Sequence, residues 1–212
     1  MKLREFSHIL AAIIIFTVIG SFSFLIESQW FILPRVLLFA TIIIFISIFS
    51  KKLMAYALDT DVEHEIWKVS RYVIIKHQRL NKEIHGGIIF PLLFSLFSLG
   101  LIKFAVFITY EARALKRRAA KRLGYYSYTE LTEWHNGLIG AAGIIAVFAI
   151  AMITYFLPYN LEYFSKLAIY YGISNLLPIS KLDGTQIFFG SRTIWTALAI
   201  IALILGAYAF IL

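Results

Sequence analysis

The sequence predicts an all-α polytopic membrane protein with about five transmembrane helices, a re-entrant segment and small cytoplasmic elements, in one membrane domain over residues 1–212. Three observations lead to this fold class. Hydrophobic residues make up 60% of the 212 residues and charged residues 15%, whereas soluble domains carry about 25% charged residues. The apolar residues gather in runs of about 20, the length that crosses a bilayer as a helix. The lysines and arginines lie mainly between these runs.

The charge and the cysteine count narrow the possible partners and sites. The formal net charge is +8, but the basic residues flank apolar runs, where they contact anionic lipid headgroups and set the topology. We therefore expect the lipid bilayer, and not nucleic acid, as the partner of this charge. The chain has no cysteine, which excludes disulfides, thiolate metal sites and cysteine nucleophiles.

Five apolar runs are the predicted spans. The first is too long for a signal peptide and continues directly into Glu27, so we expect it to be retained. The second has Pro34 near its start, where a helix tolerates proline, and stops at Lys51. The predicted spans cover residues 9–26, 30–49, 137–157, 166–179 and 193–212.

Residues 86–110 are apolar but interrupted by glycine, by Pro91 and by Lys103. Whether this segment crosses the membrane fully is inferred from the lysines and arginines of the loops that flank it. If they span fully, one of the two basic loops that flank them lies outside, against the positive-inside rule. If they dip in and return, all lysines and arginines except Arg35, Lys103 and Lys166 are cytoplasmic. We therefore predict a re-entrant segment at 86–110, a cytoplasmic amino terminus and an extracytoplasmic carboxyl terminus.

The polar segment before the re-entrant region, residues 51–85, predicts a small extramembrane element, since residues 71–76 are rich in strand-forming types. A basic segment at 113–122 follows the re-entrant region, and both segments are cytoplasmic in this topology.

The most specific local pattern lies at the cytoplasmic end of the fourth predicted span. It is formed by Asn175, Pro178, Leu182, Asp183 and Gly184. A charged carboxylate inside a bilayer costs about 2.5–3.5 kcal/mol, so an aspartate at the edge of a span is expected to have a partner or to face water. Proline stops the helix and glycine permits a tight turn. The other reading places Asp183 in an ordinary cytoplasmic turn at headgroup level.

This pattern resembles the asparagine, proline and leucine-aspartate-glycine signature of the site-2 protease family of intramembrane zinc metalloproteases. The resemblance implies that Asp183 stands where the family has a zinc ligand on a broken helix end. Residues 130–134, followed by Ala142 and Gly143, resemble the family's segment before the signature, and 86–110 resemble its re-entrant region. The resemblance extends from roughly the second span to the end of the chain.

The rest of the family's metal site is missing. The family carries a His-Glu-x-x-His motif on the second span, with two zinc ligands and a general base. The matching positions here are Ser47, Ile48 and Lys51, and residues 36–58 contain no histidine, aspartate or glutamate. Ordinary zinc proteolysis and a resident cofactor are therefore not expected. We hypothesise that the ammonium group of Lys51 replaces the charge of the metal and pairs with Asp183.

Three functions follow from these observations. The first is a non-catalytic pseudoprotease that binds membrane proteins or transmembrane peptides through the former substrate groove. The second is an active metalloprotease whose zinc is held by unconventional ligands, drawn from Asp183, His64, His85 and His135. His64 is interpreted as part of a solvated charged segment, and His85 and His135 as interfacial residues. The third is a transporter or channel, suggested by Lys103 in a broken span.

Overall fold

The computed structural model describes residues 3–71, 79–101, 103–115, 131–157 and 161–211, with the side chains of 70–83 and 210–211 left out of the description. This part of the chain is mostly helical. Four of its helices are long and apolar enough to cross a membrane, which is compatible with an integral membrane protein. They are α1 (Leu3–Ile26), α2 (Leu33–Ala57, entered through the 3-10 turn Trp30–Ile32), α5 (Glu133–Phe156) and α8 (Arg192–Ile211).

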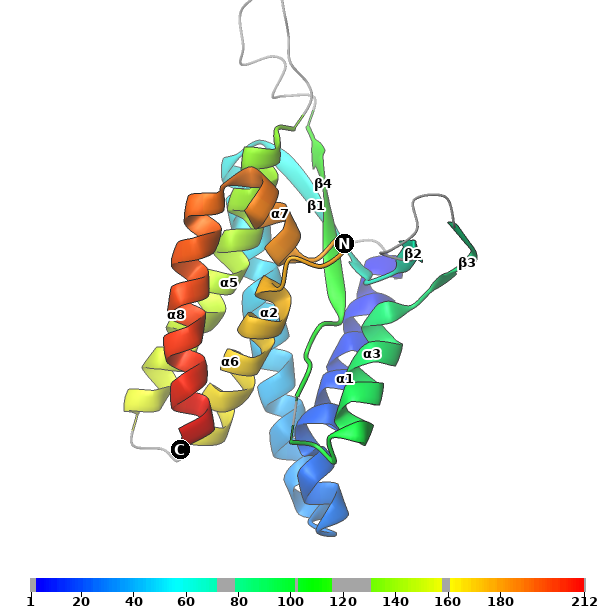
Figure 1. The fold of residues 1–212 in the computed structure, drawn as a ribbon, viewed down its shortest axis with the longest axis vertical. Coiled ribbons are helices and arrows are strands. Elements are labelled where there is room, and N and C mark those ends of the chain that lie inside the picture. The colour runs from blue at the N-terminus through cyan, green and yellow to red at the C-terminus, as the bar shows by residue number, and fades with distance from the viewer. Residues whose placement is uncertain (1–2, 72–78, 102, 116–130, 158–160, 212) are drawn as a thin grey trace, which may run out of the picture.

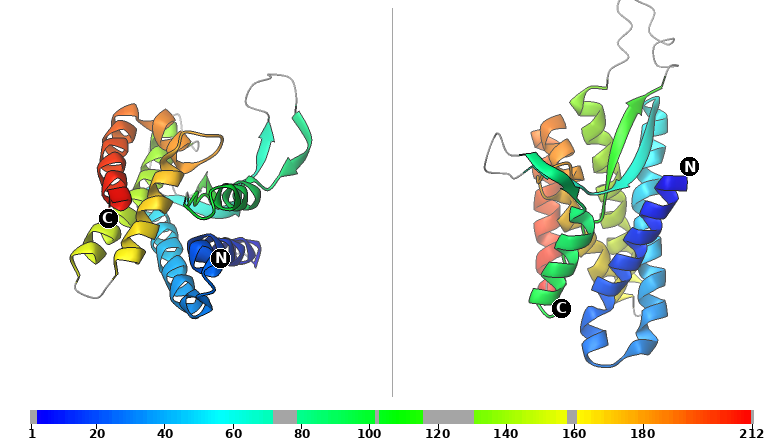
Figure 2. Two further views of the ribbon diagram at one scale, coloured as in Figure 1. Left: turned by 60° about the horizontal axis from the view of Figure 1, so that its bottom comes forward. Right: turned by 90° about the vertical axis from the view of Figure 1, so that its right-hand side faces the viewer.

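The long helices form a bundle (Figure 1). Helix α5 packs against α2, against α6 (Glu162–Leu176) and against the short α7 (Asp183–Gly190), while α1 packs on α2 and α8 on α6. Helices α1, α2, α5, α6 and α8 alternate in direction, so the start of α1, the end of α2, the start of α5 and the end of α6 lie toward the same end of the bundle (Figures 1 and 2). We call this the β end, because the strands lie there.

Helix α3 (Gly86–Phe97) begins at the β end and is followed by a chain that returns to it. At the far tip Gly100 adopts a positive φ of 81°, and its carbonyl accepts a hydrogen bond from Ser23 near the end of α1. The chain then runs back in extended form as a return segment, residues 103–107. At Phe107 it again touches the first turn of α3, because a Cβ atom on Gly87 would overlap the Phe107 carbonyl.

Two small antiparallel sheets lie at the β end, so the all-α prediction is corrected. Strand β1 (Thr60–Ile66) pairs with β4 (Ile108–Ala114), and β2 (Val69–Arg71) pairs with β3 (Arg79–Ile84). β1 and β4 are separated by more than 40 residues, and only the return of the chain after α3 brings them together (Figure 2). Because the two strands are so far apart in the sequence, no local sequence pattern predicts that they pair.

The predicted helix boundaries also need correction. Helix α2 does not stop before Lys51 but continues to Ala57, so Lys51 lies inside the helix and is buried. The predicted span at 166–179 corresponds to α6, which has 15 residues and is not among the four helices of spanning length. Part of the strand-forming stretch at 71–76, most of the basic segment at 113–122 and Glu130 lie outside the described residues.

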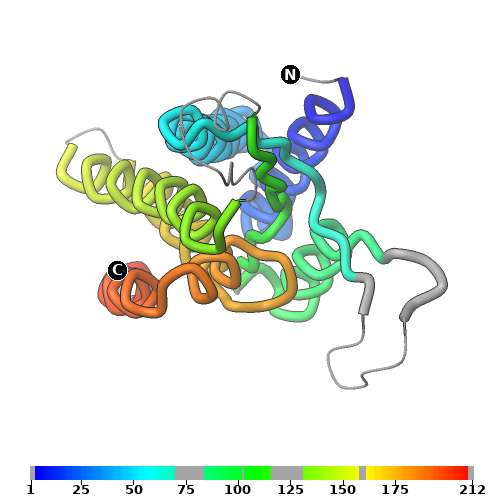
Figure 3. The backbone as a smooth tube through the Cα atoms, turned by 90° about the horizontal axis from the view of Figure 1, so that it is seen from above, coloured from blue at the N-terminus to red at the C-terminus, as the bar shows by residue number. Residues whose placement is uncertain are grey.

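The interior and the exterior of the bundle are both apolar. The main core joins α1, α2, α6 and the return segment around Phe16, whose ring centroid lies 5.2 Å from that of Phe107 and 5.7 Å from that of Tyr171. On the outer faces, large side chains such as Phe45, Leu203 and Ile204 are mostly exposed. An apolar exterior over long helices is the surface that lipid requires. Seen from the β end, the return segment lies between α1 and α6 (Figure 3).

Candidate functional site

Asp183 is the first residue of α7 and lies deep in the protein. Helix α6 ends at Leu176, the exposed Pro178 follows, and the loop reverses through Ser180, which has a φ of 55°. The chain then enters α7 with Asp183 only 1% exposed. A Cβ atom on Gly184 would overlap the main-chain carbonyl of Leu176, so only glycine lets α7 start this close to the end of α6.

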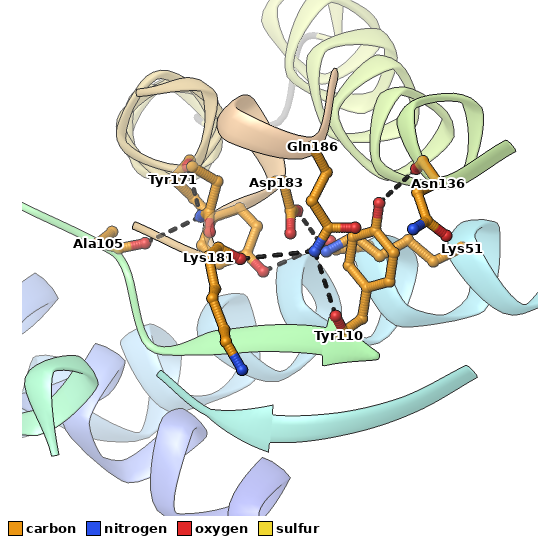
Figure 4. Close-up of polar contacts among 10 residues, drawn as sticks. Lys51, Ala105, Tyr110, Asn136, Tyr171, Lys181, Asp183 and Gln186 are labelled. Atoms are coloured by element: carbon orange, nitrogen blue, oxygen red, sulfur yellow. Dashed lines mark hydrogen bonds and ion pairs between the residues drawn. The ribbon is translucent and has the colours of Figure 1, made fainter. Parts of the chain in front are cut away.

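The structure brings Lys51 and Asp183 together. The Lys51 ammonium forms an ion pair with Asp183 Oδ2, and the two side chains are 2% and 1% exposed (Figure 4). Lys51 reaches Asp183 by lying along α5 at Gly143, where an added Cβ atom would be 2.5 Å from Lys51 Cε. Burying one charge alone costs far more than burying a pair, so each group stabilises the buried position of the other.

Tyr110, on strand β4, covers the Lys51–Asp183 ion pair on the side that faces the β end. Its ring centroid lies 5.2 Å from Lys51 Nζ, within the range of a cation–π contact. The hydroxyl of Tyr110 donates a hydrogen bond to the carbonyl of Asn136 at the start of α5. Burial, and secondarily the negative charge of Asp183, raise the pKa of Tyr110 well above its ordinary value, so the hydroxyl stays neutral. Apart from the Lys51 ammonium, no donor in the described residues makes a hydrogen bond to either Asp183 carboxylate oxygen.

Three other residues of the predicted signature, Asn175, Leu182 and Gly184, make contacts within the protein. Asn175 donates hydrogen bonds to the carbonyls of Ala105 (3.1 Å) and Tyr171 (2.8 Å), so it binds the return segment to α6. The Ala105 amide donates to the hydroxyl of Ser174 at 3.1 Å, which completes this attachment. Leu182 is fully buried against Trp67 and Val106. Asn175, Leu182 and Gly184 therefore position α7 and its aspartate.

The four candidate ligands of an unconventional zinc site are dispersed. His64 lies on β1 against α1, His85 is exposed at the start of α3, and His135 is in the first turn of α5 beside Thr132. No group of three histidine, aspartate or glutamate side chains in the described ranges is arranged to hold a metal ion.

A second charge cluster, with Glu5 and His64 buried and Lys52 about one-third exposed, lies beside the first and is not predicted by the sequence analysis. Glu5 of α1 is 5% exposed and lies 2.6 Å from Lys52 Nζ and 3.2 Å from His64 Nδ1. Successive residues of a helix point about 100° apart, so Lys51 and Lys52 reach two different carboxylates, Asp183 and Glu5. His64 is 1% exposed, which corrects its interpretation as part of a solvated segment. In the sequence, only the adjacent pair Lys51 and Lys52 hints at this second cluster.

We predict that His64 makes stability depend on pH. Burial lowers the pKa of His64 from 6.5, the hydrogen bond to Glu5 opposes this, and the charges of Lys51 and Lys52 lower the pKa further. The unfolded chain therefore takes up a proton near pH 6.5 that the folded chain resists, and stability falls as the pH drops below that value. The slope is at most about 1.4 kcal/mol per pH unit.

Thermal unfolding in detergent between pH 7.5 and 5.5 checks this. The midpoint of the wild type should fall more steeply than that of His64→Gln, whose amide can still donate to Glu5. His85→Gln, at an exposed position, should follow the wild type. Parallel curves for the wild type and His64→Gln would show that His64 does not carry the effect.

A pocket opens beside the buried pair, along the outer edge of β4. It has a volume of about 410 Å³. Its lining combines β4 with the starts of α5 and α7 and includes Tyr110, Ala112, Asn136, Lys181, Gln186 and Phe189. It is therefore adjacent to the site, with Tyr110 between the pocket and the Lys51 ammonium.

The main chain of β4 presents hydrogen-bonding groups to this pocket. The Phe107 carbonyl accepts a hydrogen bond from the Trp67 amide, and the Leu115 amide donates one to the Asp59 carbonyl. In β4, therefore, the main-chain amides and carbonyls of odd-numbered residues point toward β1, and those of even-numbered residues point outward. Gln186 accordingly donates to the outward carbonyl of Tyr110 at 3.2 Å. The outward amide and carbonyl of Ala112 have no hydrogen-bond partner among the described residues. Among these residues, the outer edge of β4 is therefore open at Ala112.

Comparison of the chain with models of protein families, with curated proteins and with solved structures finds no match.

Proposed function

We propose that the chain is a non-catalytic, site-2-protease-like membrane protein that holds a segment of a membrane-protein partner beside the Lys51–Asp183 pair. One observation carries the proposal: a lysine, and not a metal-binding side chain, faces Asp183 inside the protein. A hydrolytic zinc centre needs three protein ligands and an open position. An ammonium group in contact with the carboxylate repels a divalent cation and uses the charge that the metal would need.

Burial at the α2 positions that match the metal-binding motif of the site-2 protease family supports the proposal. Ser47, Ile48 and Lys51 stand where the family has its first histidine, its glutamate and its second histidine. Ser47 and Lys51 are both 1% exposed, and Ser47 accepts a hydrogen bond from Tyr171 on α6 at 3.4 Å. This part of α2 therefore faces the protein interior with a hydroxyl and an ammonium group. Neither is a zinc ligand in ordinary metalloproteases.

The proposed topology places the β end and the amino terminus in the cytoplasm. It treats α6 as a fifth, short crossing and α3 with the return segment as a re-entrant element. The support is that α3 and the return segment begin and end beside Gly87 and Phe107, and that Ser174 and Asn175 satisfy the main chain at Ala105. Non-helical backbone at membrane depth needs such partners. The distribution of lysine and arginine gives the orientation.

We propose the outer edge of β4 as the place where the partner binds. An extended peptide adds to an open edge through main-chain hydrogen bonds, and adjacent pockets take its side chains. The unpaired main chain of Ala112 and the 410 Å³ pocket next to it supply both. The pocket lies at the β end, so it would receive the stretch of a partner that enters or leaves the membrane there.

Site-specific photo-crosslinking tests this proposal. A photoreactive amino acid in place of Phe189, which is 65% exposed and lines the pocket, should crosslink to an integral membrane protein in native membranes. Mass spectrometry should map the crosslink to a transmembrane or juxtamembrane segment. The same amino acid in place of Ile204, exposed on the outer face of α8, should give no such product.

A proline variant tells strand addition from chance proximity. The Ala112 amide points away from β1, so Ala112→Pro removes a donor for the partner and leaves the β1–β4 ladder intact. We expect Ala112→Pro to reduce the crosslink at least fivefold and Ala112→Val to retain it. The proposal is wrong if no membrane protein is captured, or if both variants crosslink equally.

An active metalloprotease with unconventional ligands is the alternative. It would require at least two of His64, His85 and His135 to leave their places on separate elements and approach Asp183. Cleavage of the crosslinked partner that depends on zinc and on Asp183 would favour this alternative.

A further inference from the structure

A second cationic site lies at the opposite end of the bundle from the Lys51–Asp183 pair. Lys103, in the return segment, points its ammonium group at α6: Nζ lies 3.1 Å from the hydroxyl oxygen of Tyr163. The same ammonium lies 4.7 Å from the ring centroid of Tyr163 and 5.9 Å from that of Tyr170. Two aromatic faces and one hydroxyl therefore hold Lys103 in place.

This site has positive charge without a matching negative charge. The Tyr163 hydroxyl donates to the carbonyl of Gly20, so it accepts from Lys103, and within the described ranges the other two ammonium donors have no hydrogen-bond acceptor. Lys166, one turn along α6 from Tyr163, is close enough for its charge to act on Lys103. Neither lysine forms an ion pair with a carboxylate of the described chain. Two partly buried cations side by side repel each other unless an anion joins them.

The surroundings of the two lysines are apolar and open. At the tip between α3 and the return segment, Phe97, Leu99 and Leu101 are 83%, 67% and 79% exposed. Inside the tip, the rings of Phe94 and Phe104 pack with centroids 5.1 Å apart. Exposed side chains of this size beside cations form a surface with an apolar part and an anion-binding part.

The level of the site along the helices suits a headgroup. Tyr163 reaches Gly20 and the tip reaches Ser23, which are six and three residues before the end of α1 at Ile26. At 1.5 Å per residue, these contacts lie within about 10 Å of the helix end, near the boundary between headgroups and acyl chains.

We infer that Lys103 and Lys166 bind the phosphate of an anionic phospholipid. Lys103 lies against the face of α6 that carries Tyr163, Lys166 and Tyr170, and a phosphate offers several acceptor oxygens to two neighbouring ammonium groups. The acyl chains run from this level toward the bilayer centre, past exposed side chains of α3 such as Leu93 and Leu96. This site is independent of the proposed partner site at the β end, and neither requires the other.

Native mass spectrometry of the purified protein in detergent tests the inference. The protein is titrated with phosphatidylglycerol and with phosphatidylcholine that carry the same acyl chains, and the one-lipid adducts are compared. Two lysines are expected to give the anionic lipid a preference of roughly tenfold or more. An equal affinity for the two lipids would overturn the inference. So would competition by micromolar inorganic phosphate, because it would identify a free-phosphate site.

The variants assign the preference to these residues. Lys103→Gln combined with Lys166→Gln should reduce it to within about twofold, whereas Lys103→Arg, which keeps the charge, should retain most of it. Lys166→Gln alone changes a partly exposed residue and should cost about fivefold, so the test does not depend on the fold tolerating a change at Lys103. Lys68→Gln at the β end should bind as the wild type does. A preference unchanged in the double variant would contradict the assignment.

Discussion

Lys51→Ala should lower the free energy of unfolding by about 3–5 kcal/mol, and Asp183→Ala should do the same, because each change leaves a buried charge without its partner. The side chains that remain are 1–2% exposed and cannot reach water. The double variant removes both charges and should be much less destabilised than the sum of the two single variants. Reversible unfolding in detergent, with all four chains measured under one condition, gives the coupling energy.

Lys52 supplies the matched control. It is the next residue of α2, but its ammonium pairs with Glu5 and not with Asp183. Lys52→Ala and Asp183→Ala should therefore add to within about 0.5 kcal/mol, whereas Lys51→Ala and Asp183→Ala should not. If Lys51→Ala and Asp183→Ala proved mild and fully additive, the two groups would not act as a pair.

Replacing Ser47 with histidine, Ile48 with glutamate and Lys51 with histidine should create a zinc site. Positions 47 and 51 lie one turn apart on the buried face of α2, and the side chain at position 51 already reaches Asp183. Two histidines at this spacing with one carboxylate make the three protein ligands of a hydrolytic zinc centre. Elemental analysis after dialysis should find about one zinc ion per chain, from three protein ligands.

Two controls show whether the new site has the expected composition. Adding Asp183→Asn to the triple variant should abolish zinc binding, because the third ligand is lost. The double variant Ser47→His, Ile48→Glu keeps Lys51 and should bind no zinc, because the ammonium still occupies the position next to Asp183. If zinc binding to the triple variant did not depend on Asp183, α2 and α7 would not form one metal site.

The sequence predicts much of the bundle because the length of an apolar run and the position of a proline are local properties. The mostly helical chain, with several helices long enough to cross a membrane, is confirmed. The end of α2 was misjudged for a physical reason: a lysine usually marks the end of a span, but Lys51 has a buried partner and lets the helix continue to Ala57. The count of five spans and the orientation stay predictions.

The site was predictable only where one residue's chemistry demanded a partner. Asp183 at the edge of a span requires a cation, and Lys51 was identified as a candidate from the resemblance. The β1–β4 pairing and the Glu5–Lys52–His64 cluster depend on elements far apart in sequence. Glu5 and His64 are separated by 59 residues, and nothing in either neighbourhood points to the other.

Metal analysis of the wild-type protein tests the central claim most directly. Protein purified without chelators, then dialysed against trace zinc, should contain no more zinc than the Asp183→Asn variant treated in the same way. One tightly held divalent ion per wild-type chain, lost in Asp183→Asn and bound through histidine nitrogens, would contradict the claim that Lys51 takes the place of a metal.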